Sequence, residues 1–166
     1  MYFADARWWA WHKDKPAFQA FAGDKVTIEN TGALVDDPAV FMLHNYGTTG
    51  LSEKPNGLMT GQNSGHQAMN LAVLLGAKRI LLLGFDMKAG ERGQMHWFGD
   101  HPIPTQASSF SAMLHNFGKT LKPLAAAGVE VINCTPGSAL ACYPRRSLDE
   151  ALASLVDDPE PAALSA

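Results

Sequence analysis

Residues 61–86 read GQNSGHQAMNLAVLLGAKRILLLGFD, which is a polar turn, then a helical pattern, then a short apolar run. Asn63 or Ser64 is placed to cap the helix, and Gly76 is expected to end it. The apolar residues of the helix follow the i, i+3, i+4, i+7 spacing of one buried face: Ala68, Leu71, Ala72 and Leu75. This stretch therefore predicts a helix followed by a strand, the building unit of an α/β protein.

The apolar run at residues 79–83 has the pattern of a strand covered on both faces in a parallel sheet, and Asp86 follows its carboxyl end. Ligands of open α/β sheets collect at that edge. The free N–H groups and positive dipole end of the preceding helix favour an anionic group such as phosphate. Asn63, Ser64 and Gly65 are therefore candidate binding residues, although the same three residues also fit a plain helix cap and turn.

Length and composition favour one compact domain. The chain has 166 residues, of which 46% are hydrophobic and 17% charged, so we expect a single α/β domain at residues 1–156 and a flexible tail at residues 157–166. The net charge of -3 offers no basic surface for nucleic acid. No apolar stretch approaches the roughly 20 residues that cross a bilayer, and the first residues do not have the pattern of a signal peptide. We therefore expect a cytoplasmic protein without membrane or nucleic-acid partners, in which Cys134 and Cys142 are free thiols.

The remaining segments alternate between strand and helix patterns. Helices are expected after Asp5, at residues 16–22, from Ser108 or Ser109 to near Pro123, and at residues 148–155, and strands are expected at residues 25–29, 40–44 and 129–132. Residues 45–60 and 87–107 are predicted to be loops. This order predicts a Rossmann-like, mostly parallel sheet with helices on both faces.

Three tryptophans lie close together near the start of the chain. Trp8, Trp9 and Trp11 cannot all lie on the same face of one helix, so a core role is expected for Trp8 or Trp9. An exposed tryptophan beside an open sheet edge would favour self-association. A homo-oligomer is therefore a further expectation.

The long loop carries the second group of candidate residues, HWFGDHP at residues 96–102. His96 or His101 is a candidate general base, because imidazole changes charge near neutral pH, and Asp86 would orient it. A metal site with His96, Asp100, His101 and Asp86 as ligands is the competing possibility, although the spacing matches no standard zinc motif. A third possibility is that the two aromatic residues between the histidines anchor the loop while the histidines make surface hydrogen bonds.

A family resemblance rests on several of these motifs taken together over roughly residues 60–150. Their order and spacing resemble the bacterial sialyltransferases that use CMP-sialic acid. They are also similar to the wider domain-of-unknown-function 115 type, which includes archaeal hydroxymethylpterin diphosphokinases and many prophage-encoded proteins. The motifs are Asn63-Ser64-Gly65, Gly84-Phe85-Asp86, the cluster from His96 to His101, Asn133-Cys134-Thr135 and Ser138-Ala139-Leu140.

The resemblance implies a nucleotide at the carboxyl edge of the sheet, contacted by Asn63, Ser64 and Gly65. It also implies that His101 is the nearest match to the catalytic base and that Ser138 helps to close the nucleotide pocket. The first strand and glycine-rich turn of the family have no counterpart, so the fold is expected to be shortened at its N-terminus.

The expected function is that of a nucleotide- or nucleotide-sugar-binding, transferase-like protein without a resident cofactor, related to glycosyl or diphosphoryl transfer. Two alternatives stay open. One is a non-catalytic, phage-derived binding or assembly protein. The other is a metal-dependent hydrolase that uses the histidine cluster.

Overall fold

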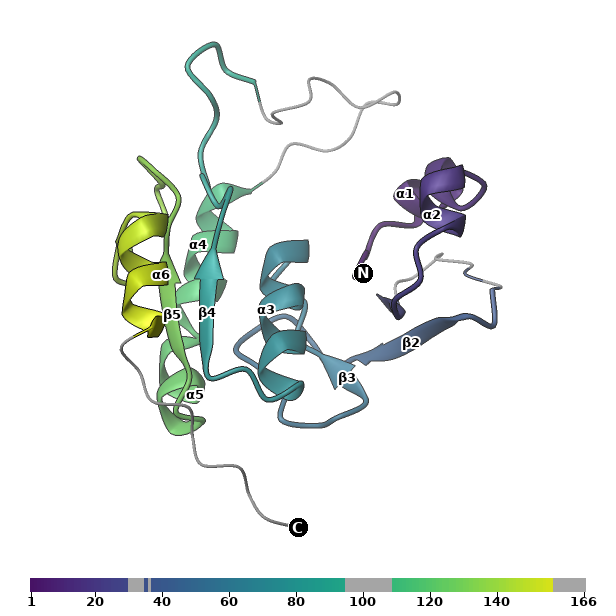
Figure 1. Cartoon of the computed structure of the whole chain (residues 1–166), viewed down its shortest axis with the longest axis horizontal. Helices are drawn as coiled ribbons and strands as arrows, with labels where there is room; N and C mark the ends of the chain where they lie inside the picture. The colour runs from purple at the N-terminus through teal and green to yellow at the C-terminus, as the bar shows by residue number, and fades with distance from the viewer. Residues whose placement is uncertain (30–34, 36, 95–108, 157–166) are drawn as a thin grey trace.

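The computed structural model describes residues 1–29, 35, 37–94 and 109–156 (Figure 1). Strands and helices alternate over much of this part of the chain. In chain order the elements are α1 (Ala6–His12), α2 (Pro16–Gln19), β1 (Lys25–Ile28), β2 (Val40–Asn45), β3 (Gly57–Leu58), α3 (Ser64–Leu74), β4 (Arg79–Leu82), α4 (Phe110–Gly118), α5 (Leu121–Ala126), β5 (Glu130–Asn133) and α6 (Leu148–Val156).

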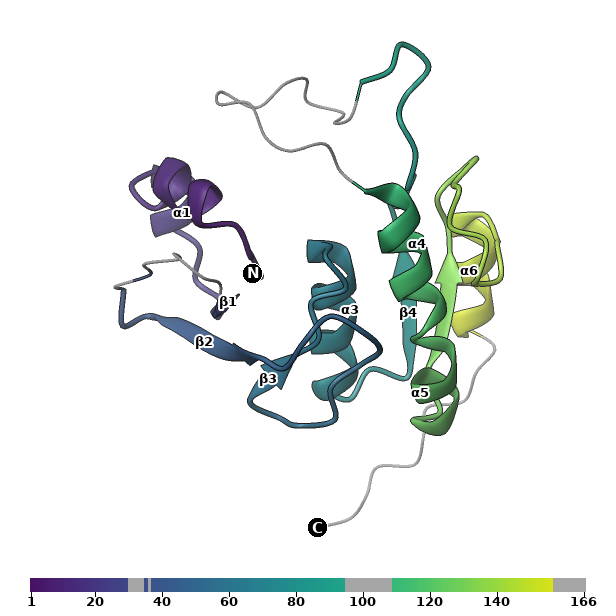
Figure 2. The ribbon, with the colours of Figure 1, turned by 180° about the vertical axis from the view of Figure 1, so that it is seen from behind.

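The described strands form two small parallel sheets. One sheet has the order β1-β2-β3 and the other pairs β4 with β5, with Arg79 opposite Glu130 and Leu82 opposite Asn133. Helix α3 lies between the two sheets (Figures 1 and 2). The chain is therefore an α/β protein with parallel strands. The single continuous sheet expected from the strand–helix alternation is not found among the described strands.

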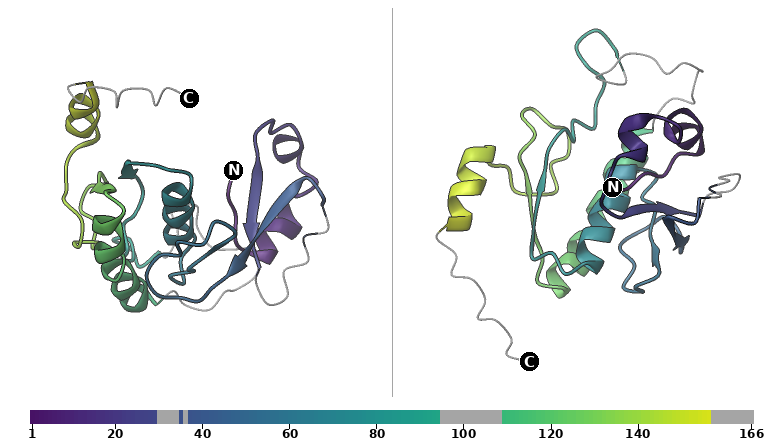
Figure 3. Two further views of the ribbon diagram at one scale, coloured as in Figure 1. Left: turned by 90° about the horizontal axis from the view of Figure 1, so that it is seen from below. Right: turned by 45° about the vertical axis from the view of Figure 1, so that its right-hand side comes forward.

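Helices cover both faces of the β4–β5 sheet, as predicted (Figure 3). Leu82 of β4 packs with Phe117 of α4 and Leu124 of α5 in the main core. Neighbouring side chains in a strand alternate between the faces of a sheet. Leu81 accordingly packs on the opposite side with Ile132 and with Ala151 of α6. This alternation explains why the residues that follow Arg79 in β4, Ile80–Leu82, are all apolar.

A second, smaller core holds the aromatic N-terminal region together. Trp9 is only 5% exposed and stacks on Phe3, with the Phe18 ring edge-on to both. The predicted core role of Trp8 or Trp9 is thereby confirmed. The hydroxyl of Tyr2 donates a hydrogen bond of 2.5 Å to Gln67 Oε1, which connects this region to α3.

The predicted buried face of α3 was wrong. Ala68 is exposed and Leu75 is 78% exposed, whereas the buried residues of the helix are His66, Gln67, Met69 and Asn70. The reason is that the side chains of Gln67 and Asn70 find hydrogen-bond partners in the segment before the helix. Asn70 Oδ1 accepts from the backbone N–H groups of Ser52 and Met59, at 2.9 and 3.0 Å, and Asn70 Nδ2 donates to the Ser52 carbonyl at 3.0 Å.

Two other boundaries also differ from expectation. The predicted loop at residues 45–60 contains the short strand β3. The helix predicted to run to Pro123 is divided into α4 and α5, and Pro123 lies in the first turn of α5, where its missing N–H would have had no intrahelical acceptor. Other signals were correct, since Gly76 and Gly128 follow their helices with left-handed φ of 89° and 63°. No described helix is long and apolar enough to cross a membrane, and both cysteines are free thiols.

Candidate functional site

The start of α3 is held by Asn63. Its side-chain oxygen accepts the backbone N–H of His66 at 3.1 Å, so Asn63 is the N-cap, as predicted. Its amide nitrogen is 3.5 Å from the sulfur of Met113 on α4. Ser64 and Gly65 are the first two residues of the helix, and N–H groups at these positions have no intrahelical acceptor. The Asn63 side chain is therefore occupied in capping, whereas the amides of Ser64 and Gly65 are the groups suited to an anion.

The carboxyl end of β4 is joined to the turn after β5 by three hydrogen bonds. The Phe85 N–H donates to Thr135 Oγ1 at 2.9 Å, Ser138 Oγ donates to the Phe85 carbonyl at 2.5 Å, and the Ala139 N–H donates to the Asp86 carbonyl at 2.8 Å. Asp86 itself is exposed. These bonds bring together two of the segments that the sequence predicted to share one edge.

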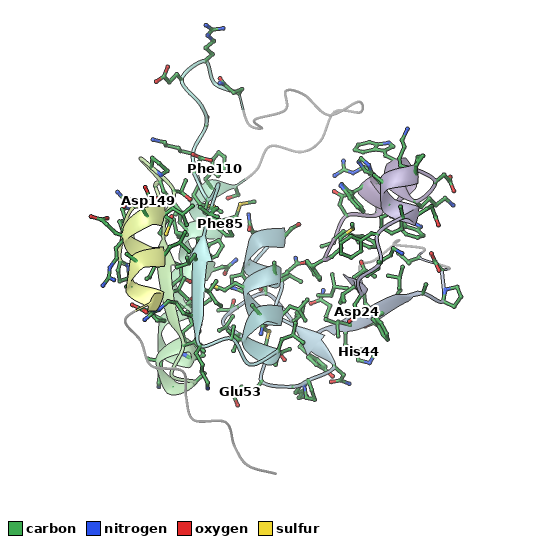
Figure 4. The ribbon with its side chains drawn as sticks, in the orientation of Figure 1. Asp24, His44, Glu53, Phe85, Phe110 and Asp149 are labelled. Carbon is green, nitrogen blue, oxygen red and sulfur yellow. The ribbon has the colours of Figure 1, made fainter. Side chains whose placement is uncertain are left out.

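The start of α3 meets this junction through Gly65. A Cβ on Gly65 would lie 2.6 Å from the Phe85 ring, so only glycine permits this close approach. Phe85, labelled in Figure 4, follows β4. Its ring is edge-on to that of Phe117 of α4. Residues 63–65, 84–86 and 138–140, predicted separately as binding segments, therefore come together around one phenylalanine.

Ser138 has a structural role at this junction. It is 3% exposed, and its hydroxyl accepts the Leu140 N–H at 3.0 Å in addition to donating to the Phe85 carbonyl. The hydroxyl is thus used in shaping the turn, and the described contacts give no support to the nucleotide contact implied by the resemblance.

Two cationic side chains border the same turn. Lys88 Nζ lies 3.6 Å from the position that a Cβ would occupy on Gly137, whose φ is 63°. The Arg145 guanidinium donates a hydrogen bond to the Ser138 carbonyl. Both side chains belong to exposed residues. The junction therefore combines exposed positive charge with the start of a helix, and this combination favours an anionic ligand.

His66 was not predicted as a site residue, yet it has the most unusual environment in this region. It is fully buried, and neither ring nitrogen has a hydrogen-bond partner among the residues that the structure describes. Its ring is edge-on to Phe117 at a centroid distance of 5.3 Å. Burial lowers the pKa of His66 from 6.5 to about 4. The backbone of Met59 acts in the opposite direction and raises this pKa, but by less than burial lowers it. No sequence signal marked this residue, because the helical pattern assigned it to the polar face.

The histidine cluster lies outside the described residues. This applies to His96, Asp100 and His101, so their approach to Asp86 stays a prediction. Within the described ranges, no group of three or more histidine, cysteine, aspartate or glutamate side chains is arranged to hold a metal ion.

Comparisons with protein-family models, with curated proteins and with solved structures found no match to the chain.

Proposed function

We propose that the chain is a transferase-like protein with a Rossmann-like arrangement, and that it binds the phosphate of a nucleotide or nucleotide sugar where α3 begins and β4 ends. The observation that carries this proposal is the junction around Phe85. There the start of α3, the end of β4 and the turn after β5 meet, and Lys88 lies beside that turn at Gly137.

The chemistry of the junction suits phosphate for two independent reasons. The N–H groups of Ser64 and Gly65 lie at the positive end of the 11-residue helix α3, where a negative charge is stabilised. Lys88 and Arg145 supply formal positive charge at the neighbouring turn. A nucleotide diphosphate or a nucleotide sugar carries the negative charge that both features favour.

A thermal shift assay tests the binding step. CMP, CDP, other nucleotides and CMP-activated sugars are added to the protein at concentrations far above the expected Kd. A ligand at a hundred times its Kd stabilises the folded state by about 2.7 kcal/mol, which corresponds to a rise in Tm of roughly 5–10 °C for a domain of this size. No shift with any nucleotide or nucleotide sugar would contradict the proposal.

A matched pair of lysine variants then locates the site. Lys88→Gln removes the cation beside Gly137, and we expect it to weaken nucleotide binding about tenfold, because a charge-assisted hydrogen bond contributes roughly 1.5 kcal/mol. Lys78→Gln is the control, since Lys78 is also exposed but precedes β4 at the opposite end of the strand. Equal effects of the two substitutions on the Kd, measured by calorimetry, would show that binding occurs elsewhere.

The transfer step rests on His101 as the base and Asp86 as its partner, with His96 as the second candidate. We expect His101→Ala to slow the release of nucleotide from the activated donor about 100-fold or more, which is the typical contribution of a general base, while nucleotide affinity stays within about threefold of wild type. His96→Ala is the comparison variant. A His101→Ala protein with unchanged turnover would remove His101 from the mechanism without affecting the binding proposal.

A further inference from the structure

The turn that precedes α3 has a strained backbone. Gly61 and Gln62 are consecutive residues in the left-handed region, with φ of 57° and 58°. Glycine adopts this conformation readily, but a residue with a Cβ such as Gln62 does not. The turn at residues 60–63 therefore needs support from its surroundings to stay closed.

Four hydrogen bonds hold the turn in place. The Thr60 N–H donates to the Gly47 carbonyl at 2.7 Å and the Gly61 N–H donates to the Thr48 carbonyl at 3.0 Å. Two side-chain amides donate to carbonyls of the turn. Asn116 Nδ2 donates to Gly61 at 3.0 Å, and Gln67 Nε2 donates to Thr60 at 3.2 Å.

The His66 ring lies directly against this turn. A Cβ on Gly61 would lie 2.2 Å from the ring, so the backbone of Gly61 rests on the imidazole without a side chain between them. The ring is completely buried and both of its nitrogens lack hydrogen-bond partners. Even the neutral ring therefore leaves one N–H donor and one acceptor buried without partners, and protonation would add a charge to this site.

Within the described parts of the chain, no charged side chain compensates for a charge on the His66 ring. From α4 it is faced by the uncharged ring of Phe117, and from the preceding segment by the backbone of Met59 and Gly61. Among the described residues no charged side chain contributes to the pKa of His66. The one titratable side chain of α4, His115, is exposed. A protonated imidazole would therefore be a buried cation with two N–H donors and no anionic partner, which is strongly unfavourable.

We propose that His66 is an acid-sensitive latch, whose neutral ring supports the closed turn at residues 60–63 and whose protonation opens that turn. Opening hydrates both ring nitrogens and relieves the left-handed backbone of Gln62. This device goes beyond nucleotide binding and does not depend on it, although it would also release the cap at Asn63 and so change the start of α3.

The size of the effect follows from proton linkage. With a pKa of about 4 in the closed form and 6.5 in a hydrated form, lowering the pH from 7 to 5 favours opening about 20-fold. Hydrogen exchange measured by NMR reports this directly, because in the closed form the Gly61 N–H donates to the Thr48 carbonyl and the Asn63 N–H donates to the Thr60 carbonyl. We expect their protection factors to fall about 20-fold between pH 7 and pH 5.

Local opening must be separated from global unfolding, which also exposes His66. Low urea concentrations make this distinction, since a local opening exposes little surface and responds weakly to denaturant. Exchange at Gly61 should be insensitive to low urea, while exchange at Cys134, whose N–H bonds to Leu82 in the β4–β5 sheet, should accelerate. Parallel responses of both amides to urea would overturn the latch.

Two variants complete the test. His66→Phe keeps a ring of similar size that cannot be protonated, and it should abolish the fall in protection at Gly61. His115→Phe, at an exposed position of α4, should retain it. If His66→Phe does not fold, the ring pKa of the wild-type protein decides the question. A value near 4, with the Gly61 amide shift titrating at the same pH, supports the latch, and a value near 6.5 overturns it.

Discussion

Asn70 provides the sharpest test of how α3 is connected to the segment at residues 52–59 that precedes it. It is completely buried in α3, and its side chain makes three hydrogen bonds to the backbone of Ser52 and Met59. These bonds are the reason that a polar face of α3 is directed inwards. Asn70→Ala would leave two N–H groups and one carbonyl without their partner.

The magnitude follows from these three groups. Each buried polar group left unsatisfied costs about 1–3 kcal/mol, and partial hydration recovers some of it, so we expect Asn70→Ala to lower the free energy of unfolding by about 3–5 kcal/mol. The free energy of unfolding of a typical domain is about 5–15 kcal/mol, so this loss would be a large fraction of the stability. Urea denaturation followed by circular dichroism measures it.

Asn56→Ala is the matched control for this experiment. Asn56 is exposed, and its side-chain oxygen accepts one hydrogen bond of 2.9 Å from the Tyr46 hydroxyl. Because water replaces an exposed partner, this substitution should cost less than about 1 kcal/mol. If Asn70→Ala and Asn56→Ala destabilise the protein equally, the polar packing of α3 does not stabilise the fold in the way argued above.

Three further predictions concern the start of α3. The folded-state pKa of His66, about 4, is below the unfolded value of 6.5, so its contribution to stability is complete above pH 6.5 and is lost as the pH falls to 4. The loss amounts to about 3 kcal/mol, and His66→Phe should remove this part of the pH dependence in urea titrations. Asn63→Ala removes the cap and should lower the free energy of unfolding by about 1 kcal/mol. Ser64→Ala, at the exposed next position, is the control and should lower it by less than about 0.5 kcal/mol. Equal melting temperatures of the two variants would contradict the capping role of Asn63. Gly61→Ala adds a Cβ that would lie 2.2 Å from the His66 ring, on a backbone with φ of 57°. We expect this substitution to lower the free energy of unfolding by about 2–4 kcal/mol. Stability close to that of the wild type would contradict the close packing of Gly61 on His66.

The local signals in the sequence were reliable where they depend on backbone chemistry. Asp5 caps α1 by accepting the Arg7 N–H at 2.8 Å, and Ser147 and Glu150 exchange hydrogen bonds at the start of α6. Caps and glycine stops act within a few residues, so one sequence contains all of the groups that decide them. The strands β4 and β5 were found for a similar reason, because burial on both faces demands continuous apolar residues.

Side-chain partners distant in sequence decided the rest. The sequence determined the order of helices and strands except for β3 and the division between α4 and α5, and it determined the starts of α1, α3 and α6. It also placed Asn63 at the start of a helix and Asp86 after the end of a strand. Tertiary structure alone decided that α3 buries polar residues, that Ser138 supports a turn, and that His66 lies unpartnered beneath Gly61. The physical reason is that a hydrophobic pattern records only the cost of exposing apolar groups. It does not record which distant backbone amides or carbonyls will satisfy a buried polar side chain, and that depends on where the folded chain places them.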